Sequence, residues 1–335
     1  MKIIAWTAPL VAALASSTAA VAGEAKTASA PTWSLAIHGG AGVIERADMS
    51  AEKDAAYRAA LRAALDAGAA VLKAGGSSTD AITAVIARLE EDPKFNAGKG
   101  AVYTWDGTHE LDASIMDGRT RAAGAVAGVT TVRSPITLAR RVMEDGPHVM
   151  LAGKGAEEFA KEKGLEMVPN SWFDTPERLE ALERLKAEKL SAIDVDIKYG
   201  TVGAVALDTH GNMAAGTSTG GMTGKRWNRI GDAPVIGAGT YAENGVCAVS
   251  ATGWGEFFIR VGVARTICAR ISMKGETAQA AADETLADVV RLGGDGGVIV
   301  VGPTGDAVFA MSDGMYRGRA TSAGVNEVAI YGDER

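Results

Sequence analysis

Cysteine, aromatic residues and clustered positive charge are all scarce in this sequence. Two of the 335 residues are cysteines, and 5% of the residues are aromatic. The formal net charge is −7, and the lysines and arginines are scattered among acidic residues. No basic stripe is present that would neutralise the phosphates of a nucleic acid. We therefore expect no nucleic-acid partner.

The sequence also lacks the common metal-binding motifs. No CxxC or HExxH motif occurs, and the four histidines are far apart, so the sequence does not support a catalytic transition metal. The two cysteines, Cys247 and Cys268, each lie among apolar residues. In an exported protein they could pair, but one bridge is no framework for a domain of this size, and buried free thiols are the favoured interpretation.

Glycine and aliphatic residues, by contrast, are abundant. The sequence contains 42 glycines, and 47% of its residues are hydrophobic. This composition favours close packing of the backbone and does not fit a disordered chain. The chain is long enough to bury a large core, either as one α/β domain or as two smaller domains.

Residues 1–22 have the pattern of a signal peptide. Lys2 supplies a positive charge, residues 3–15 are apolar, and residues 20–22 have the small-x-small pattern of a cleavage site. The apolar run is too short to favour a membrane anchor. We therefore expect an exported protein, periplasmic or secreted, without membrane contact once the signal is removed.

Helix and strand patterns alternate along the rest of the chain. Ser50 and Ser77 suit the N-caps of helices that continue to about residues 74 and 90, and further helical patterns cover 135–144, 257–273 and 276–292. Short apolar runs predict strands at 33–37, 102–105, 111–116, 128–132, 201–207, 213–217, 235–238, 246–250, 297–301 and 307–311. Residues 154–200 are rich in glutamate and lysine, which predicts an exposed, partly helical linker with little core. The arrangement predicts two stacked sheets with helices outside them.

Two glycine-rich segments are candidate binding loops. Residues 38–42 follow the first predicted strand and could hold a phosphate, but they match neither the dinucleotide nor the P-loop spacing, and a tight turn is favoured. Residues 89–100 end a helix before Pro93 and continue through a polar, glycine-rich turn. Backbone carbonyls there could hold a hard cation, although the residue types alone favour a plain loop.

The strongest chemical signal is Thr201, which follows Gly200 and opens a strand of small apolar residues. A threonine can act as a nucleophile when its own α-amine serves as the base, which requires cleavage of the preceding peptide bond. Glycine before that bond tolerates strained backbone angles. We therefore expect a self-processing amidohydrolase. The alternative is that Thr201, Thr217 and Thr219 are ordinary strand threonines.

A set of motifs in order along the chain resembles the plant-type L-asparaginase and isoaspartyl peptidase (β-aspartyl-peptidase) family of N-terminal-nucleophile hydrolases. The segments that carry the resemblance are residues 38–42, 95–98, 109–113, 116–118, 200–208, 217–221, 229–232, 251–256 and 293–297. The resemblance implies an αββα sandwich of the α/β (α+β) class. It also implies autocleavage into an α-subunit, residues 23–200, and a β-subunit, residues 201–335, which together form one domain.

The family resemblance assigns roles to several residues. It implies that Thr201 is the nucleophile and, through its freed amine, the general base, and that Thr219 orients its hydroxyl. Thr252 and the backbone N–H of Gly253 are expected to form the oxyanion hole, with Asn96 as a helper.

The resemblance also implies the substrate site. Arg229 is expected to bind the α-carboxylate of an aspartyl unit and Asp232 its α-ammonium group. Gly255 should lie against the ligand, and the remaining expected substrate-binding residues are Ile230, Gly231, Thr252, Gly253 and Trp254. This recognition suits L-asparagine and β-aspartyl dipeptides, although Trp227 and Asn228 leave the preference between them open.

The family further implies a structural sodium ion, no catalytic cofactor, and an (αβ)₂ heterotetramer. The expected sodium ligands are the main-chain carbonyls of Leu89, Glu90, Asp92, Phe95, Ala97 and Lys99. Two alternatives remain at this point. Glycosylasparaginases share the mechanism but resemble a pattern with aspartate before the nucleophile, which Gly200 argues against. An exported, non-enzymatic ligand-binding protein predicts a single intact chain.

Overall fold

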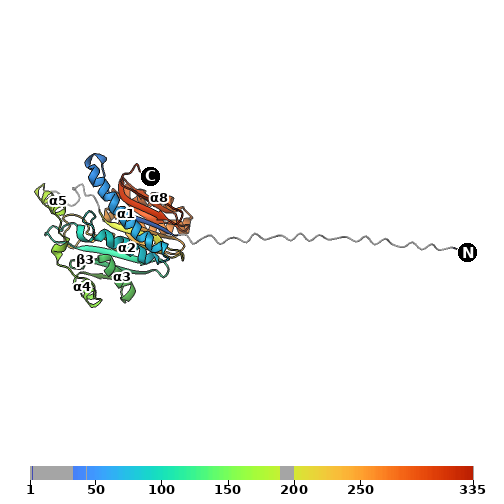
Figure 1. Ribbon diagram of the computed structural model, residues 1–335, viewed down its shortest axis with the longest axis horizontal. Helices are drawn as coiled ribbons and strands as arrows, with labels where there is room; N and C mark the ends of the chain where they lie inside the picture. The colour runs from blue at the N-terminus through green and yellow to red at the C-terminus, as the bar shows by residue number, and fades with distance from the viewer. Residues whose placement is uncertain (1, 3–32, 43, 189–199, 335) are drawn as a thin grey trace. The chain divides into compact units, whose positions relative to one another are not determined.

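Two facing β-sheets form the centre of the computed structural model, which describes residues 2, 33–42, 44–188 and 200–334 (Figure 1). The elements below belong to one unit, Pro31–Arg335. The predicted signal peptide, apart from Lys2, and residues 189–199 of the predicted linker lie outside the described residues. Within the described part of the chain, no helix has the length and apolar character needed to cross a bilayer.

The larger sheet has eight strands in the order β12-β11-β1-β5-β6-β2-β3-β4, and only its β3–β4 pair is parallel. Its strands are β1 (Ser34–Gly42), β2 (Leu111–Asp117), β3 (Ala122–Val129), β4 (Met150–Ala152), β5 (Val202–Leu207), β6 (Met213–Thr219), β11 (Gly314–Thr321) and β12 (Asn326–Ala329). The smaller sheet, in the order β10-β9-β8-β7, contains β7 (Thr240–Glu243), β8 (Cys247–Gly253), β9 (Gly296–Val301) and β10 (Ala307–Met311).

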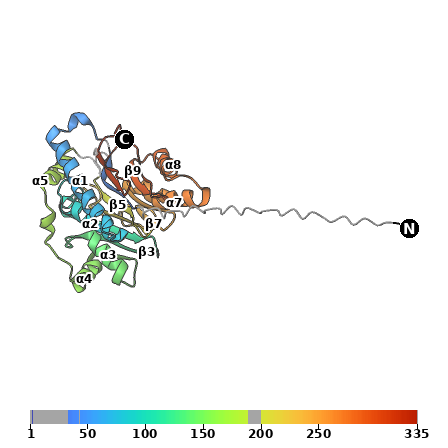
Figure 2. The same ribbon diagram turned by 45° about the vertical axis from the view of Figure 1, so that its right-hand side comes forward.

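Helices cover the outer face of each sheet, which gives the four-layer αββα sandwich. The helices on the larger sheet include α1 (Ala51–Lys73), α2 (Ser78–Glu90), α3 (Pro135–Asp145) and α4 (Gly153–Glu162). The smaller sheet packs against α7 (Val263–Lys274) and α8 (Ala278–Arg291), with α6 (Gly255–Val261) beside them. Figure 2 shows β5 and β9 between α2 on one side and α7 and α8 on the other. The predicted fold class is confirmed.

The alternation of side chains along the central strands builds two cores. On β1, Leu35 and Ile37 belong to the core under α1 and α2, whereas Ala36 points into the core shared with the smaller sheet. On β5, Ala204 and Val205 divide in the same way. This alternation is the period-2 pattern of a sheet that is buried on both faces.

Local capping signals predicted helix starts well. The hydroxyls of Ser50 and Ser77 accept hydrogen bonds from the backbone N–H groups of Lys53 and Asp80, at 3.2 and 3.0 Å. Thr175 caps α5 (Pro176–Ala187) in the same way, through the N–H of Arg178. These caps satisfy backbone donors that have no partner within the first turn.

Several predicted elements were wrong. Residues 38–42 are part of β1, with a register irregularity between His38 and Ala41, and do not form a tight turn. Residues 102–105 are not a strand, because Trp105 pairs its backbone with Lys225 instead. Residues 235–238 are also outside the strands, and the helix predicted over 257–273 is divided at Gly262, whose φ is +63°.

The segment after α3 is more closely packed than predicted. Residues 153–187 contain α4, α5 and the short 3-10 helix Asn170–Phe173, and Phe173 is fully buried. Leu182 and Leu185 of α5 are also buried. Most described residues from 154 to 188 are nevertheless exposed, so the partly helical segment contributes only a few side chains to the core, because a few apolar side chains at helical spacing suffice to dock a charged helix.

The expectation of free cysteines was also wrong. Cys247 on β8 and Cys268 on α7 form a disulfide, with a Cα–Cα distance of 5.6 Å, within the usual range for such bonds. The bridge fastens α7 to the strand that carries Thr252. Both cysteines lie in the core shared by the two sheets, so the expected burial is confirmed.

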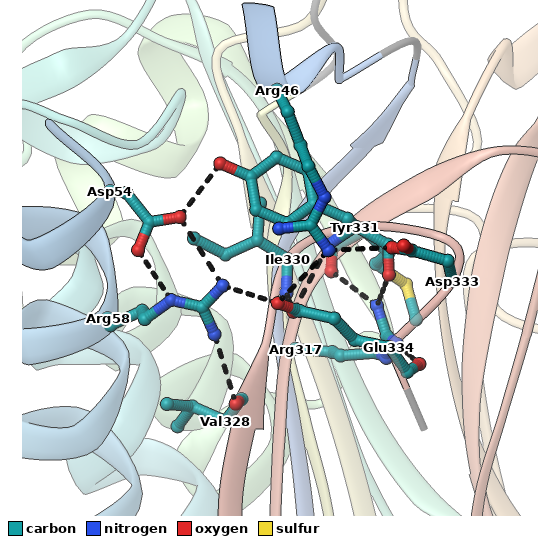
Figure 3. A network of polar contacts seen from close by, with 10 residues as sticks. Arg46, Asp54, Arg58, Arg317, Val328, Ile330, Tyr331, Asp333 and Glu334 are labelled. Atoms are coloured by element: carbon teal, nitrogen blue, oxygen red, sulfur yellow. Dashed lines mark hydrogen bonds and ion pairs between the residues drawn. The ribbon is translucent and has the colours of Figure 1, made fainter. Parts of the chain in front are cut away.

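The C-terminal residues are held against α1 by a network of charged side chains (Figure 3). Arg58 pairs with Asp54 at 2.6 Å and with Glu334 at 2.6 Å, and the Tyr331 hydroxyl donates to Asp54 at 2.8 Å. Arg317, which is 2% exposed, donates to the main-chain carbonyls of Met315, Tyr331 and Glu334. We call the segment Ala329–Glu334 and these partners the C-terminal strap.

Candidate active site

Two adjacent strands bring Thr201 and Thr219 together. Thr201 immediately precedes β5, Thr219 ends β6, and the register pairs Val202 with Ser218. The two hydroxyl oxygens are 2.9 Å apart. The Thr219 hydroxyl also accepts the backbone N–H of Gly221 at 3.0 Å, which leaves its own proton available for Thr201.

Thr252 and Gly253 come from the facing sheet, at the end of β8. The Thr252 hydroxyl is buried and has no hydrogen-bond partner among the described residues. Gly253 has a φ of +153°, and a methyl group in its place would overlap the Asp295 carbonyl. A buried polar atom without a partner is costly, so such groups are typical of sites that receive a ligand.

Asn96 fixes the chain on the acyl side of Thr201. Its backbone N–H donates to the Gly200 carbonyl at 2.9 Å. Its side-chain amide donates to the Gly221 carbonyl at 2.7 Å and accepts the N–H of Val102 at 3.0 Å. Asn96 is therefore held rigidly, with a donor directed at the carbonyl that precedes Thr201.

Arg229, Asp232 and Gly255 form a second cluster. A methyl group at Gly255 would lie 2.9 Å from Arg229 Nη2 and 3.0 Å from Asp232 Oδ1, so only a residue without a side chain fits between them. Asp232 Oδ2 is buried without a partner among the described residues. Burial raises the pKa of Asp232 to about 7, although the charge of Arg229 opposes the shift.

Glu256 also belongs to this cluster, and the sequence analysis did not identify it as a site residue. Its carboxylate accepts two hydrogen bonds from Arg229, at 2.9 and 2.7 Å. The paired geometry holds the guanidinium plane in one orientation. Two other residues predicted to bind substrate have different surroundings from this cluster. Ile230 is 40% exposed, and Trp254 packs edge-on against Phe257.

His38 contacts the main chain of the predicted nucleophile. Its Nδ1 donates to the Thr201 carbonyl at 2.9 Å, and its Nε2 is 2.9 Å from the Ser250 hydroxyl. Burial lowers the pKa of His38 to about 3, so the ring is neutral near pH 7. From the sequence, His38 could be recognised only as part of a motif and Ser250 not at all. The two residues meet only because the two sheets pack face to face.

Comparisons with known proteins identify the family of this chain. An asparaginase family model matches residues 31–330. The chain belongs to the asparaginase family. The isoaspartyl peptidase of Salmonella typhimurium is 47% identical over 306 residues, which cover 89% of this chain and 98% of the relative. The Escherichia coli isoaspartyl peptidase is 46% identical, with 89% of this chain and 95% of the relative covered, and the human isoaspartyl peptidase/L-asparaginase is 44% identical, with 82% and 88% covered.

The loop expected to hold sodium in this asparaginase-family chain folds closely on its own backbone, where the carbonyls of Leu89, Asp92, Phe95 and Ala97 accept N–H groups of the same loop. A methyl group at Gly98, whose φ is +52°, would overlap the Glu90 carbonyl oxygen, and one at Gly100 would overlap that of Phe95. The Glu90 side chain is engaged elsewhere, where it accepts hydrogen bonds from Ser134 and Ser218. Main-chain oxygens are suitable ligands for a hard cation, and the sodium site stays a prediction.

Other side chains in that loop do not converge on one point. Asp92 pairs with Lys94 at 2.8 Å, and the Lys99 ammonium lies 4.4 Å from the centre of the Trp172 ring. The chemistry of the loop therefore depends on its backbone, which explains why the residue types alone favoured a plain loop.

Proposed function

We propose that this protein is an isoaspartyl peptidase and L-asparaginase that matures by cutting its own Gly200–Thr201 bond. The family membership and the printed activities of the relatives support the substrate class. The observation that carries the proposal is the alignment at Thr201, whose hydroxyl lies 2.9 Å from Thr219 while a donor from Asn96 lies 2.9 Å from the Gly200 carbonyl.

In the maturation step, the Thr201 hydroxyl oxygen attacks the Gly200 carbonyl carbon, and Thr219 orients the hydroxyl. The Asn96 N–H stabilises the negative charge that develops on the carbonyl oxygen. Breaking the C–N bond gives an ester, with the proton transferred to the departing nitrogen. Water then hydrolyses the ester and leaves Thr201 as the first residue of the β-subunit, with a free α-amine.

In substrate hydrolysis, that amine acts as the general base for the hydroxyl of the same residue. A reference α-amine has a pKa of about 8, so a useful neutral fraction exists near pH 7. Arg229 binds the substrate α-carboxylate and Asp232 its α-ammonium, which places the side-chain amide at Thr201. The unpartnered Thr252 hydroxyl and the Gly253 N–H receive the oxyanion, ammonia or an amino acid leaves, and water releases aspartate.

The remaining features of the proposal extend beyond the site. We propose an α-subunit, residues 23–200, a β-subunit, residues 201–335, and an (αβ)₂ heterotetramer. The carbonyls of residues 89–99 would hold a structural sodium ion that fixes the loop leading to Asn96. Residues 1–22 would direct export and be removed.

Intact mass spectrometry and N-terminal sequencing test the central claim. We expect two fragments, with the smaller beginning at Thr201, and activity on both L-asparagine and β-aspartyl-leucine. Thr201→Ala should abolish both cleavage and hydrolysis, whereas Arg229→Ala should abolish hydrolysis and leave cleavage intact. A fully active, uncut chain would refute the proposal, and an inactive uncut wild type would favour a ligand-binding protein.

A further inference from the structure

A row of buried hydroxyl groups runs through the space between the two sheets and ends at His38. The Ser250 hydroxyl lies 2.9 Å from His38 Nε2 and 2.7 Å from the Thr217 hydroxyl. Thr217 contacts Thr240, and Thr240 lies 2.8 Å from Ser114. All four hydroxyl residues and His38 are fully buried. We call Ser114, Thr217, Thr240 and Ser250 the hydroxyl seam.

The acceptors at one end set the direction of the protons. A carbonyl oxygen only accepts, so His38 must carry its proton on Nδ1 to bond the Thr201 carbonyl. The Nε2 of the neutral ring is then an acceptor, and Ser250 donates to it. The Thr217 proton has two acceptors within reach, the Ser250 hydroxyl at 2.7 Å and the Gly239 carbonyl at 3.1 Å, and donation over the shorter distance continues the alignment. Hydrogen bonds aligned in this way polarise and strengthen one another.

The other end of the seam reaches the substrate-binding cluster. The Ser114 hydroxyl donates to the Ala233 carbonyl at 2.6 Å, and Ala233 directly follows Asp232 in the chain. Both ends of the row are proton acceptors, so its four hydroxyl protons cannot fill all five contacts, and the Thr217–Thr240 contact is left without one. The seam therefore consists of two short hydrogen-bonded runs, one ending at His38 and one at the Ala233 carbonyl. Its members come from β2, β6, β7 and β8.

The backbone leaves space for the contact between His38 and Ser250. Strand pairing sets Gly203 beside His38 on one side and beside Thr217 on the other. A methyl group at Gly203 would overlap both the Ser250 hydroxyl and His38 Nε2. Glycine at position 203 is thus required for the seam to reach the histidine.

We propose that His38 is a positioning residue for Thr201, and that the hydroxyl seam holds it in one tautomer and one orientation. Thr201 has no preceding residue after maturation, so rotation about its backbone would move both the amine and the hydroxyl. The hydrogen bond from Nδ1 to its carbonyl fixes the peptide plane from which the amine and the hydroxyl project. This inference rests on the proposed role of Thr201 as the nucleophile.

Two amide substitutions at His38 distinguish a role in positioning Thr201 from a role in filling space in the core. In His38→Asn the amide nitrogen can occupy the place of Nδ1 and still donate to the Thr201 carbonyl. In His38→Gln the amide reaches the place of Nε2, where it contacts Ser250 and not Thr201. We expect His38→Asn to keep kcat within about fivefold of wild type, and His38→Gln to lose about 100-fold, the cost of a misplaced reacting group.

The measurements are kcat and KM for L-asparagine per mature site, with the mature fraction determined by intact mass. KM should change less than about threefold in both variants, because the substrate-binding groups remain in place. The half-time of cleavage in the full-length chain should lengthen in His38→Gln and change little in His38→Asn. Equal losses in the two variants would overturn the inference.

A second pair of variants tests the seam with a matched control. Ser250→Ala removes the donor to His38, and Ser34→Ala removes another fully buried serine hydroxyl, on the same strand as His38, that donates to the Gly305 carbonyl. We expect similar decreases in Tm, but a decrease of about tenfold or more in kcat for Ser250→Ala alone. Unchanged kcat in Ser250→Ala would contradict a role for the seam.

The outcomes distinguish this inference from the proposed function. If Thr201→Ala remains active, the proposed nucleophile is wrong. If Thr201→Ala is inactive while His38→Gln turns over like wild type, the proposed function stands and the positioning role of His38 is refuted.

Discussion

The hydroxyl seam and the C-terminal strap are both polar networks, but the first is built from neutral groups and the second from charged ones. The seam consists of neutral hydroxyls that are fully buried between the sheets, ending on a neutral histidine. The strap consists largely of ion pairs at the edge of the larger sheet, where Arg58 and Glu334 side chains are 28% and 23% exposed (Figure 3). From this comparison we expect changes in the seam to alter the chemistry and changes in the strap to alter the stability.

Electrostatics explains the division. A charge buried between the sheets would carry a large desolvation cost unless it were fully paired. A charge fixed beside Thr201 would also shift the pKa of the amine on which the proposed mechanism depends. Neutral hydroxyls position the residue without either penalty. At the sheet edge, partial hydration of Arg58 and Glu334 lowers the cost of holding their charges together, whereas the buried Arg317 depends on its three carbonyl acceptors.

The largest expected effect comes from removing the hydroxyl that touches the nucleophile. We expect Thr219→Val to reduce kcat and slow autocleavage by about 100-fold, because the Thr201 hydroxyl loses the partner that orients it. Loss of the bond to Gly221 should cost only about 1 kcal/mol of stability. Progress curves on L-asparagine and intact mass against time provide the measurement.

Thr219→Ser is the matched control, because it keeps the oxygen and loses only a methyl group. It should retain most of the activity of the wild type. An active Thr219→Val variant would show that the 2.9 Å contact between the two hydroxyls has no role in the chemistry.

The strap should show the reverse pattern when Arg317 is replaced. Arg317→Met leaves three carbonyl oxygens without their donor, and we expect a loss of about 3 kcal/mol in the free energy of unfolding. Urea denaturation in a Thr201→Ala background keeps the chain in one piece and avoids subunit dissociation. In the mature enzyme, kcat should stay within about twofold of wild type, because the strap lies outside the proposed site.

Arg319→Met is a useful control, because Arg319 lies on the same strand but its side chain is partly exposed and pairs with Glu327 at 2.6 Å. Loss of this ion pair should lower the free energy of unfolding by about 1 kcal/mol or less. If Arg317→Met abolished turnover in a folded enzyme, the proposed division between chemistry and stability would be wrong.

The two networks also differ in how far they could be foreseen from the sequence. Helix caps such as Ser50 and Ser77 are local signals, and their predictions are confirmed. The layered fold follows from strand and helix patterns that are local as well. Thr201 stood out from its own segment, Gly200 followed by a strand of small apolar residues, and the resemblance to a family added Arg229, because its motif is contiguous.

Other features depend on contacts between distant strands and helices. Ser250 and Thr217 lie 33 residues apart and meet only across the two sheets. The disulfide joins cysteines from β8 and α7, whose approach no local pattern reveals. The end of the chain carried no clear strand signal, yet Arg317 and its carbonyl acceptors hold it in place.

The charge of Asp232 distinguishes the substrate site from the neutral hydroxyl seam, and its effect on ligand binding should depend on pH. Burial raises its pKa to about 7, so it becomes protonated as the pH falls below neutrality and then attracts the substrate ammonium less. We expect the inhibition constant of L-aspartate to rise about tenfold per unit below about pH 7. Competition assays between pH 5.5 and 8.5 measure this slope.

In Asp232→Asn the inhibition constant should be high at every pH and lack this slope. A flat profile in the wild type would mean that Asp232 stays ionised throughout, and therefore that the site compensates its burial more fully than Arg229 alone does.

The smallest expected effect comes from removing the charge of Glu334. Burial raises the pKa of Glu334, but the hydrogen bond from Arg58 and the backbone N–H of Ile330 outweigh this and hold it below its usual value. A lowered pKa in the folded state stabilises the protein above the unfolded pKa of about 4.3, and this contribution disappears as the pH falls through the folded pKa.

We therefore expect Glu334→Gln to lower the free energy of unfolding by about 1 kcal/mol at pH 7. The effect is small because the Arg58–Glu334 pair is partly exposed. The difference from wild type should decrease as the pH falls below the unfolded pKa of about 4.3, and it should shrink in 1 M salt, since ions screen partly exposed charges. Urea unfolding in the Thr201→Ala background measures both trends. The cost of Ser250→Ala should be the same in low and high salt, because the seam contains no charge. If salt weakened both networks equally, their electrostatic distinction would fail.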